Sequence, residues 1–194
     1  GEIRKVDGKM GLWSKRGDKF KIKPKYDEIK SGGDYYLIAK TKGKYGLMET
    51  DGEYTIKPKY EEMTYTPRGY IVKSKGNYGV VYRNGDIGID IQYKKIDFFE
   101  ISNGFRVYNG KKYGFYDEFH NLKINVDVAS IESTPIYNTV IMATTGAAIL
   151  VNLTGGKSKG YSKMLSGKNN CFIVETKGKY GVIDSTGAEK IPAK

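Results

Sequence analysis

Histidine and cysteine, which form many metal sites and nucleophile pairs, occur once each in this sequence of 194 amino acids. His120 is the single histidine and Cys171 the single cysteine. A metal site built from imidazole and thiolate needs several such ligands, and a cysteine nucleophile needs a base beside it. The sequence therefore predicts no metal site, no cofactor and no disulfide within the chain. We expect His120 to occupy a turn position and Cys171 to be a small buried apolar residue.

A short glycine-lysine-serine segment resembles the end of a phosphate-binding loop, at Gly156-Lys157-Ser158. That motif requires another glycine five residues before its second glycine, and Val151 stands there. We therefore interpret the segment as a flexible turn.

Two pairs of adjacent carboxylates could in principle act as an acid and a base, at Asp27/Glu28 and Glu61/Glu62. Two catalytic carboxylates must converge on one substrate, usually about 5–9 Å apart. Adjacent residues of a strand instead point to opposite faces, and the two pairs occupy equivalent positions of a repeat. We interpret both pairs as part of a structural surface and predict that the protein is not an enzyme.

A repeated segment organises the chain, and its clearest copy is GKYGLMETDGEYTIKPKYEEM at residues 43–63. Related segments start at Gly8 and Gly76, fainter copies follow, and a partial copy starts at Gly178. The spacing of the copies is 34, 33, 35 and 33 residues at five aligned tetrapeptides: Tyr26–Ile29, Tyr60–Met63, Tyr93–Ile96, Val128–Ile131 and Tyr161–Met164. Residues 115–165 are the most divergent, either through drift, which we favour, or through a specialised surface. A regular period of this length predicts a repeat architecture.

Each repeat of about 34 residues contains three short segments typical of β-strands. Asp-Gly and Asn-Gly pairs such as Asp51-Gly52 predict type I′ hairpin turns between strands. The segment at 20–26 alternates, which places Ile22, Pro24 and Tyr26 on one side and three lysines on the other. Because proline cannot donate to a strand ladder, Pro24 and Pro58 indicate an edge or a bulge. The sequence therefore predicts an all-β fold of tandem three-stranded repeats.

Together these motifs resemble the WG (KWG) β-repeat family of bacterial proteins. The motif residues are Gly11, Gly17, Ile22, Pro24 and Tyr26; Gly46, Gly52, Ile56, Pro58 and Tyr60; Gly79, Gly85, Ile89 and Tyr93, with Ile91 for proline; and Gly181, Gly187 and Ile191, with a shifted Pro192. The family's tryptophan is replaced by Met10, Tyr45, Tyr78, Tyr113 and Tyr180. The resemblance implies a bacterial source, an all-β array used for interaction, and no shared catalytic residues.

The repeats predict one domain over residues 1–194, with units near 8–42, 43–75, 76–109, 110–143 and 144–177. A partial unit at 178–194 would pair with residues 1–7. Such complementary ends are how a β-propeller closes its ring. We slightly favour a propeller-like closed array over an open β-superhelix, although units of this length are short for propeller blades.

The formal net charge of +11 makes anionic partners worth considering, but the charge forms no block. No apolar run approaches the roughly 18 residues of a membrane span. The sequence starts at Gly1 without methionine and has no secretory signal, so we expect a processed or excised piece. An export or cell-envelope signal would lie outside it, and the compartment stays open.

Two sets of residues are candidates for binding. Exposed tyrosines suit recognition of a protein or a sugar, and the candidates are Tyr35, Tyr36, Tyr65 and Tyr70. The alternative is that most of these tyrosines belong to the core. A row of lysines can follow a polyanion by counterion release, and the candidates are Lys23, Lys25, Lys57, Lys59, Lys94 and Lys95. The alternative, which we favour, is that these lysines only protect a solvated strand face. We expect a non-catalytic repeat domain that binds a protein; the alternative is a basic surface that binds a cell-envelope glycan or nucleic acid.

Overall fold

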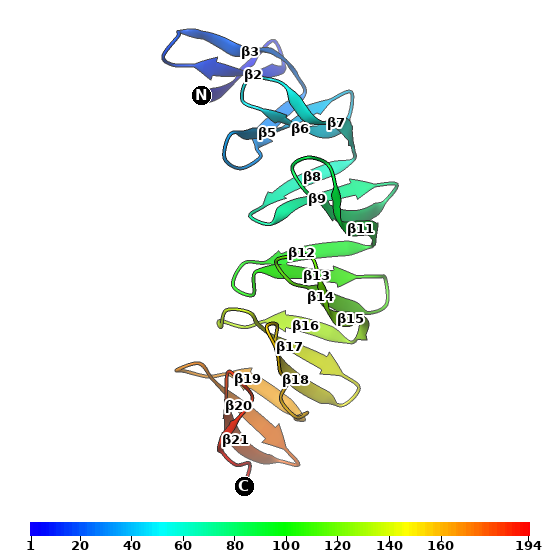
Figure 1. Ribbon diagram of the computed structural model, residues 1–194, viewed down its shortest axis with the longest axis vertical. Helices are drawn as coiled ribbons and strands as arrows, with labels where there is room; N and C mark the ends of the chain where they lie inside the picture. Colours follow the sequence, from blue (N-terminus) through cyan, green and yellow to red (C-terminus); the bar gives the residue numbers. More distant parts are fainter. The chain divides into compact units, whose positions relative to one another are not determined.

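The computed structural model describes all residues from 1 to 194 and contains only β-strands and their connections (Figure 1). Its 22 strands form six small antiparallel sheets, none of which closes on itself. No helix long and apolar enough to cross a membrane is present. The chain divides into two compact units, Gly1–Lys94 and Lys95–Lys194, which we describe separately. The all-β prediction is confirmed.

The first unit contains three sheets. The first sheet consists of β1 (Glu2–Val6), β2 (Lys9–Ser14) and β3 (Lys19–Tyr26). The second consists of β4 (Glu28–Ser31), β5 (Tyr36–Thr41), β6 (Lys44–Glu49) and β7 (Tyr54–Tyr60). The third consists of β8 (Glu62–Thr66), β9 (Gly69–Ser74), β10 (Asn77–Val81) and β11 (Ile87–Tyr93).

The second unit also contains three sheets. The fourth sheet consists of β12 (Lys95–Phe99), β13 (Gly104–Tyr108), β14 (Tyr113–Tyr116) and β15 (Leu122–Val128). The fifth consists of β16 (Ser130–Ser133), β17 (Thr139–Thr144) and β18 (Ala147–Asn152). The sixth consists of β19 (Lys163–Ser166), β20 (Cys171–Thr176), β21 (Lys179–Asp184) and β22 (Glu189–Ile191).

The prediction of three strands per repeat is wrong for four of the six sheets, which have four. The additional strand is the first strand of each four-stranded sheet. It begins two residues after the aligned tyrosine, as at Tyr26 and Glu28, with no glycine or proline to announce a turn. Each four-stranded sheet therefore begins just after the aligned tyrosine, whereas the predicted units begin at a glycine turn. The predicted unit boundaries, the single domain, the pairing of 178–194 with 1–7 and the closed array stay predictions.

The motif glycine and the motif proline fit against each other on neighbouring strands. A Cβ atom added to Gly46 on β6 would lie 2.4 Å from the carbonyl oxygen of Ile56 and 2.7 Å from the nitrogen of Pro58 on β7. Tyr45 pairs with Tyr60 while Leu47 pairs with Ile56, so β7 bulges around Pro58. Pro58 thus lies on an edge strand and at a bulge, the places where a strand tolerates a residue that cannot donate. The predicted bulge is confirmed, and it explains why the family pattern joins these residue types.

Type I′ turns occur at one predicted pair, Asp7-Gly8, where φ is 48° and 79°, but not at Asp51-Gly52 or Asn84-Gly85. At Asp51-Gly52 only the glycine has a positive φ. Both residues are positive in Lys42-Gly43, with φ of 50° and 76°, and likewise in Lys75-Gly76 and Lys177-Gly178. These lysine-glycine turns join the second and third strands of their sheets.

His120 has a φ of 64° and donates a hydrogen bond from its amide to the carbonyl of Asp117, as Gly187 does to Asp184. Its predicted turn position is confirmed.

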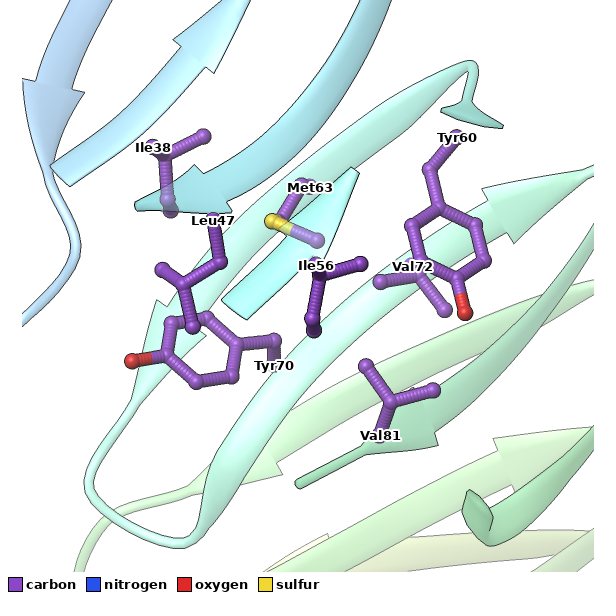
Figure 2. Close-up of a cluster of buried hydrophobic side chains, with 8 residues drawn as sticks. All are labelled: Ile38, Leu47, Ile56, Tyr60, Met63, Tyr70, Val72 and Val81. Carbon is purple, nitrogen blue, oxygen red and sulfur yellow. The ribbon is translucent and has the colours of Figure 1, made fainter. Parts of the chain in front are cut away.

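Neighbouring sheets of a unit bury their apolar residues against each other. In the first unit, one core cluster joins Ile38, Leu47 and Ile56 of the second sheet to Val72 and Val81 of the third (Figure 2). Another joins the opposite face of the second sheet, including Leu37 and Met48, to the first sheet. In the second unit, similar clusters join the fourth sheet to the fifth and the fifth to the sixth. A sheet of three or four short strands thus gains its core from its neighbours.

The residue between one sheet and the next forms a polar contact in the first unit. The Lys9 Nζ lies 2.5 Å from the carboxylate of Asp27, between the first and second sheets. Glu61 occupies the same position before the third sheet, and its carboxylate accepts hydrogen bonds from the backbone amides of Lys75 and Gly76 at 2.9 and 3.2 Å. Lys94 is the third equivalent, and its Nζ donates to Asn77. Asp27 and Glu61, the first residues of the two acidic pairs, therefore form specific polar contacts at the surface.

Candidate functional site

The predicted tyrosines lie at one end of the second and third sheets. Tyr35 ends the loop between β4 and β5, with a φ of 62° and 80% of its surface exposed. Its carbonyl accepts a hydrogen bond from the amide of Thr50 in the neighbouring loop. Tyr36 starts β5, is partly buried and packs against the core cluster drawn in Figure 2. The structure thus places an exposed ring beside a fixed one.

Tyr70 is a structural residue, so its prediction as an exposed binding residue is wrong. Its side chain is 4% exposed and belongs to the core cluster (Figure 2). The hydroxyl donates a hydrogen bond to the carbonyl oxygen of Gly32, 2.7 Å away. Burial raises the pKa of Tyr70 to about 12. Sequence alternation does not distinguish this tyrosine from exposed ones, because its partner is a backbone atom 38 residues earlier.

Two further residues complete an aromatic surface on these sheet ends. Tyr65 is 43% exposed, and its ring is 5.8 Å from that of Tyr70. A Cβ on Gly33 would lie 2.6 Å from the Tyr65 ring, so the loop backbone and this ring are in contact. The guanidinium of Arg83, after β10, lies 5.6 Å from the centre of the Tyr36 ring. We call Tyr35, Tyr36, Tyr65 and Arg83 the tyrosine cluster; Arg83 carries no repeat signal, and sequence analysis missed it.

The lysines of the two proline-containing strands lie on the solvent side, as predicted. Lys23, Lys25, Lys57 and Lys59 are all exposed on the edge strands β3 and β7. The Nζ atoms of Lys25 and Lys59 lie 5.3 and 5.1 Å from the rings of Tyr26 and Tyr60. Lysines on an edge strand also discourage pairing with another chain.

Lys94 and Lys95 do not continue this row, so their predicted equivalence is wrong. Tyr78 pairs with Tyr93 as Tyr45 pairs with Tyr60, which fixes the alignment of β11 with β7. The positions of Lys57 and Lys59 are therefore Asp90 and Gln92 in β11. Lys94 and Lys95 instead align with the acidic pairs. Lys94 binds Asn77, and Lys95 forms a 2.9 Å ion pair with Asp97.

The cysteine and the glycine-lysine-serine segment considered in the sequence analysis lie in a strand and a loop. Cys171 starts β20 and is only partly buried, so the prediction of a buried cysteine is corrected. No three His, Cys, Asp or Glu side chains are grouped as metal ligands. Residues 156–160 also match Gly-x-Ser-x-Gly, which sequence analysis missed, but that elbow needs a strand-to-helix turn. The Ser158 hydroxyl instead accepts from the Leu150 amide and donates to the Lys159 carbonyl.

The comparison with protein families identifies the repeat. Residues 45–77 match the family described as the WG containing repeat. The chain therefore contains a WG repeat. The matched segment contains Gly46, Ile56, Pro58 and Tyr60, whose packing is described above. The family resemblance is thus confirmed in a repeat that has all five motif residues. No curated protein matches the sequence.

Several solved structures are similar to the WG-repeat chain at low identity. KlHsv2, from Kluyveromyces lactis, is 13% identical with a TM-score of 0.40, and the match covers 82% of this chain and 62% of that one. The WD40 β-propeller domain of Doa1 is 14% identical with a TM-score of 0.33, covering 86% and 68%. A protein of unknown function from Bacteroides caccae is 13% identical with a TM-score of 0.30, covering 95% and 89%. The chain thus spans less than two thirds of the length of KlHsv2.

Proposed function

We propose that this WG-repeat chain is a non-catalytic interaction domain that binds a protein partner through its tyrosine cluster. The observation that carries the proposal is the Tyr35 ring, which is 80% exposed beside Tyr36, Tyr65 and Arg83. Tyrosine and arginine are enriched among the residues that dominate protein interfaces. A tyrosine ring also offers a large contact area together with a polar hydroxyl group.

The loop that carries Tyr35 and the other side chains of the cluster are held in place before a partner arrives. The Tyr70 hydroxyl fixes the loop at Gly32, and the Thr50 amide fixes the carbonyl of Tyr35. Arg83 lies over Tyr36, and the Tyr65 ring fills the space beside Gly33. Ordering of side chains and loops opposes association, so a surface that is already ordered binds with a smaller entropic loss.

The alternative is a basic surface for an anionic polymer. Lys23 and Lys57 favour it, since both are exposed and neither has an ion-pair or hydrogen-bond partner. The change to Asp90 and Gln92 in the third sheet counts against it, because a polyanion would meet a carboxylate where the row should continue. Two cationic edge strands supply a weaker and strongly salt-dependent attraction.

Affinity capture from a bacterial lysate with the 194-residue chain tests both proposals. We expect a protein that stays bound through a high-salt wash, because an aromatic interface depends little on ionic strength. Release of every bound component by salt, with nucleic acid or glycan among them, would favour the lysines. A captured protein must then bind directly as a purified sample to support the tyrosine cluster.

A further inference from the structure

Buried polar side chains are concentrated in the second unit. In the first unit Thr66 is the only buried polar or charged residue. The second unit has seven: Ser102, Asn103, Asp117, His120, Thr134, Thr139 and Ser158. Five of the seven lie in the divergent segment 115–165, and Ser102 and Asn103 donate hydrogen bonds to residues of that segment. Because burying polar groups opposes folding unless they are bonded, this concentration indicates a specialised surface rather than drift.

The turn between β14 and β15 presents an aromatic ring to solvent. The Asp117 carboxylate accepts hydrogen bonds from the amides of Phe119 and Asn121, both at 2.9 Å. Burial alone would raise the pKa of Asp117, but the hydrogen bonds from Asn121 and its other partners hold the pKa below its usual value. Phe119 is 69% exposed, just before the left-handed His120. The equivalent positions of four other sheets hold small polar residues: Asp51, Asn84, Thr154 and Thr186.

A hollow of about 210 Å³ lies beside this ring. Phe119 and Leu153 supply apolar lining, while Glu118, Asn121, Asn138 and Thr154 supply polar lining. The side chain of Asn138 has no hydrogen-bond partner, so its amide can both donate and accept. The Thr154 hydroxyl donates to Asn152, which leaves its lone pairs able to accept. The hollow therefore combines one aromatic face with both donors and acceptors.

A buried amide holds the rim of this hollow in position. The Asn103 Nδ2 donates to the Glu118 carboxylate at 2.6 Å and to the Tyr137 hydroxyl at 3.2 Å. Asn103 itself is buried, while Tyr137 is 58% exposed. Asn103 and Tyr137 belong to loops of the fourth and fifth sheets, so the bonds fix two loops together. A binding site needs this kind of second layer of support.

We propose that this hollow binds a neutral sugar residue of a glycan. A sugar ring carries hydroxyl groups that both donate and accept hydrogen bonds, which matches Asn138, Asn121 and Thr154. Its C–H face can pack on Phe119. The carboxylates of Asp117 and Glu118 disfavour an anionic ligand, and Lys123 is already ion-paired with Asp117 at 3.3 Å. The hollow has the size of one ring rather than of a folded partner.

Titration of the full chain with neutral sugars tests this proposal independently of the protein-binding surface. The probes are the methyl glycosides of glucose, galactose, mannose and N-acetylglucosamine, and their short oligomers, followed by backbone amide NMR. At least one probe should shift the amides of Phe119, Asn138 and Thr154, with no dependence on salt. Phe119→Ala should weaken this binding roughly five- to tenfold. Asn84→Ala, at the equivalent turn position of the first unit, should leave the affinity unchanged.

Any one of four results would overturn the proposal. Three of them are the absence of shifts with every neutral probe at millimolar concentration, shifts confined to residues away from the hollow, and equal binding by the Phe119→Ala variant. The fourth is stronger binding of a polyuronate than of any neutral sugar. Because Phe119 is exposed, its variant should fold. Asn138→Gly provides a second variant, since it removes the amide but tolerates the φ of 53°.

Discussion

The hydroxyl of Tyr70 donates a hydrogen bond to the carbonyl oxygen of Gly32, 2.7 Å away, and thereby links the second and third sheets. Both residues are buried, so water does not replace this bond when it is lost. The loop that it holds ends at Tyr35, the most exposed ring of the tyrosine cluster. This hydrogen bond therefore contributes both to the stability of the two sheets and to the position of the loop that carries Tyr35.

Tyr70→Phe should destabilise the protein by about 1–3 kcal/mol, because the buried carbonyl of Gly32 then lacks its partner. Urea unfolding followed by circular dichroism measures the change. Tyr65→Phe is the matched control, since the Tyr65 hydroxyl has no hydrogen-bond partner and its ring is partly exposed. Equal stability of the two variants would show that the Tyr70 bond does not hold the sheets together.

Glu61→Gln should lower the melting temperature at neutral pH, because an amide cannot accept from Lys75 and Gly76 as a two-oxygen carboxylate does. Glu53→Gln is the control, since Glu53 is exposed and its side chain has no bonded partner. An unchanged melting temperature in both variants would show that the Glu61 contact contributes nothing.

The effect of Glu61 should depend on pH. Hydrogen bonds from the amides of Gly76 and Lys75 lower the pKa of Glu61 below its ordinary value of 4.5. A carboxyl with a lowered pKa in the folded state stabilises the protein above its unfolded pKa, and this stabilisation is lost as the pH falls through the folded value. The difference between wild type and Glu61→Gln should therefore be constant from pH 7 to about pH 5 and shrink in more acidic solution. A difference that grows on acidification would contradict this account.

Gly46→Ala should destabilise the protein by more than about 1 kcal/mol, since the added methyl group would overlap the backbone of β7 at Ile56 and Pro58. Gly17→Ala is the control. A Cβ there meets only ordinary contacts of 3.5 Å or more, so the variant should lie within about 0.5 kcal/mol of wild type. Chemical denaturation of the two variants compares them directly. Equal stabilities would show that close approach is not why the motif has glycine.

Much of the fold follows from local sequence. The alternation that places Ile22 and Tyr26 inward and Lys23 outward is observed, as is the bulge at the motif proline. The first strand of each four-stranded sheet could not be predicted, because a single residue such as Asp27 separates it from the preceding strand. A turn of that kind leaves no glycine or proline in the sequence, so its signal is only the apolar Ile29 that packs in the core.

The candidate site is less predictable than the fold. Tyr35 and Tyr70 are the same residue type, yet one is exposed and the other buried, because a loop 38 residues earlier covers Tyr70. In the sequence, Lys94 follows other lysines at a similar spacing, but strand pairing aligns it with Glu61. In the second unit, divergence from the repeat marks the region around Phe119 but does not reveal its side-chain arrangement. These are long-range contacts, and short sequence patterns do not contain them.

The most direct test of the proposed function compares two purified variants in binding to a captured protein partner. Combined Tyr35→Ala and Tyr65→Ala removes two exposed rings of the tyrosine cluster, whereas Tyr180→Ala removes a ring that is 60% exposed in the second unit. We predict that the double variant folds but loses at least tenfold in affinity, since truncating interface residues of this kind commonly costs about 1–2 kcal/mol each. Tyr180→Ala should bind as wild type does. Wild-type affinity in the double variant would contradict the account.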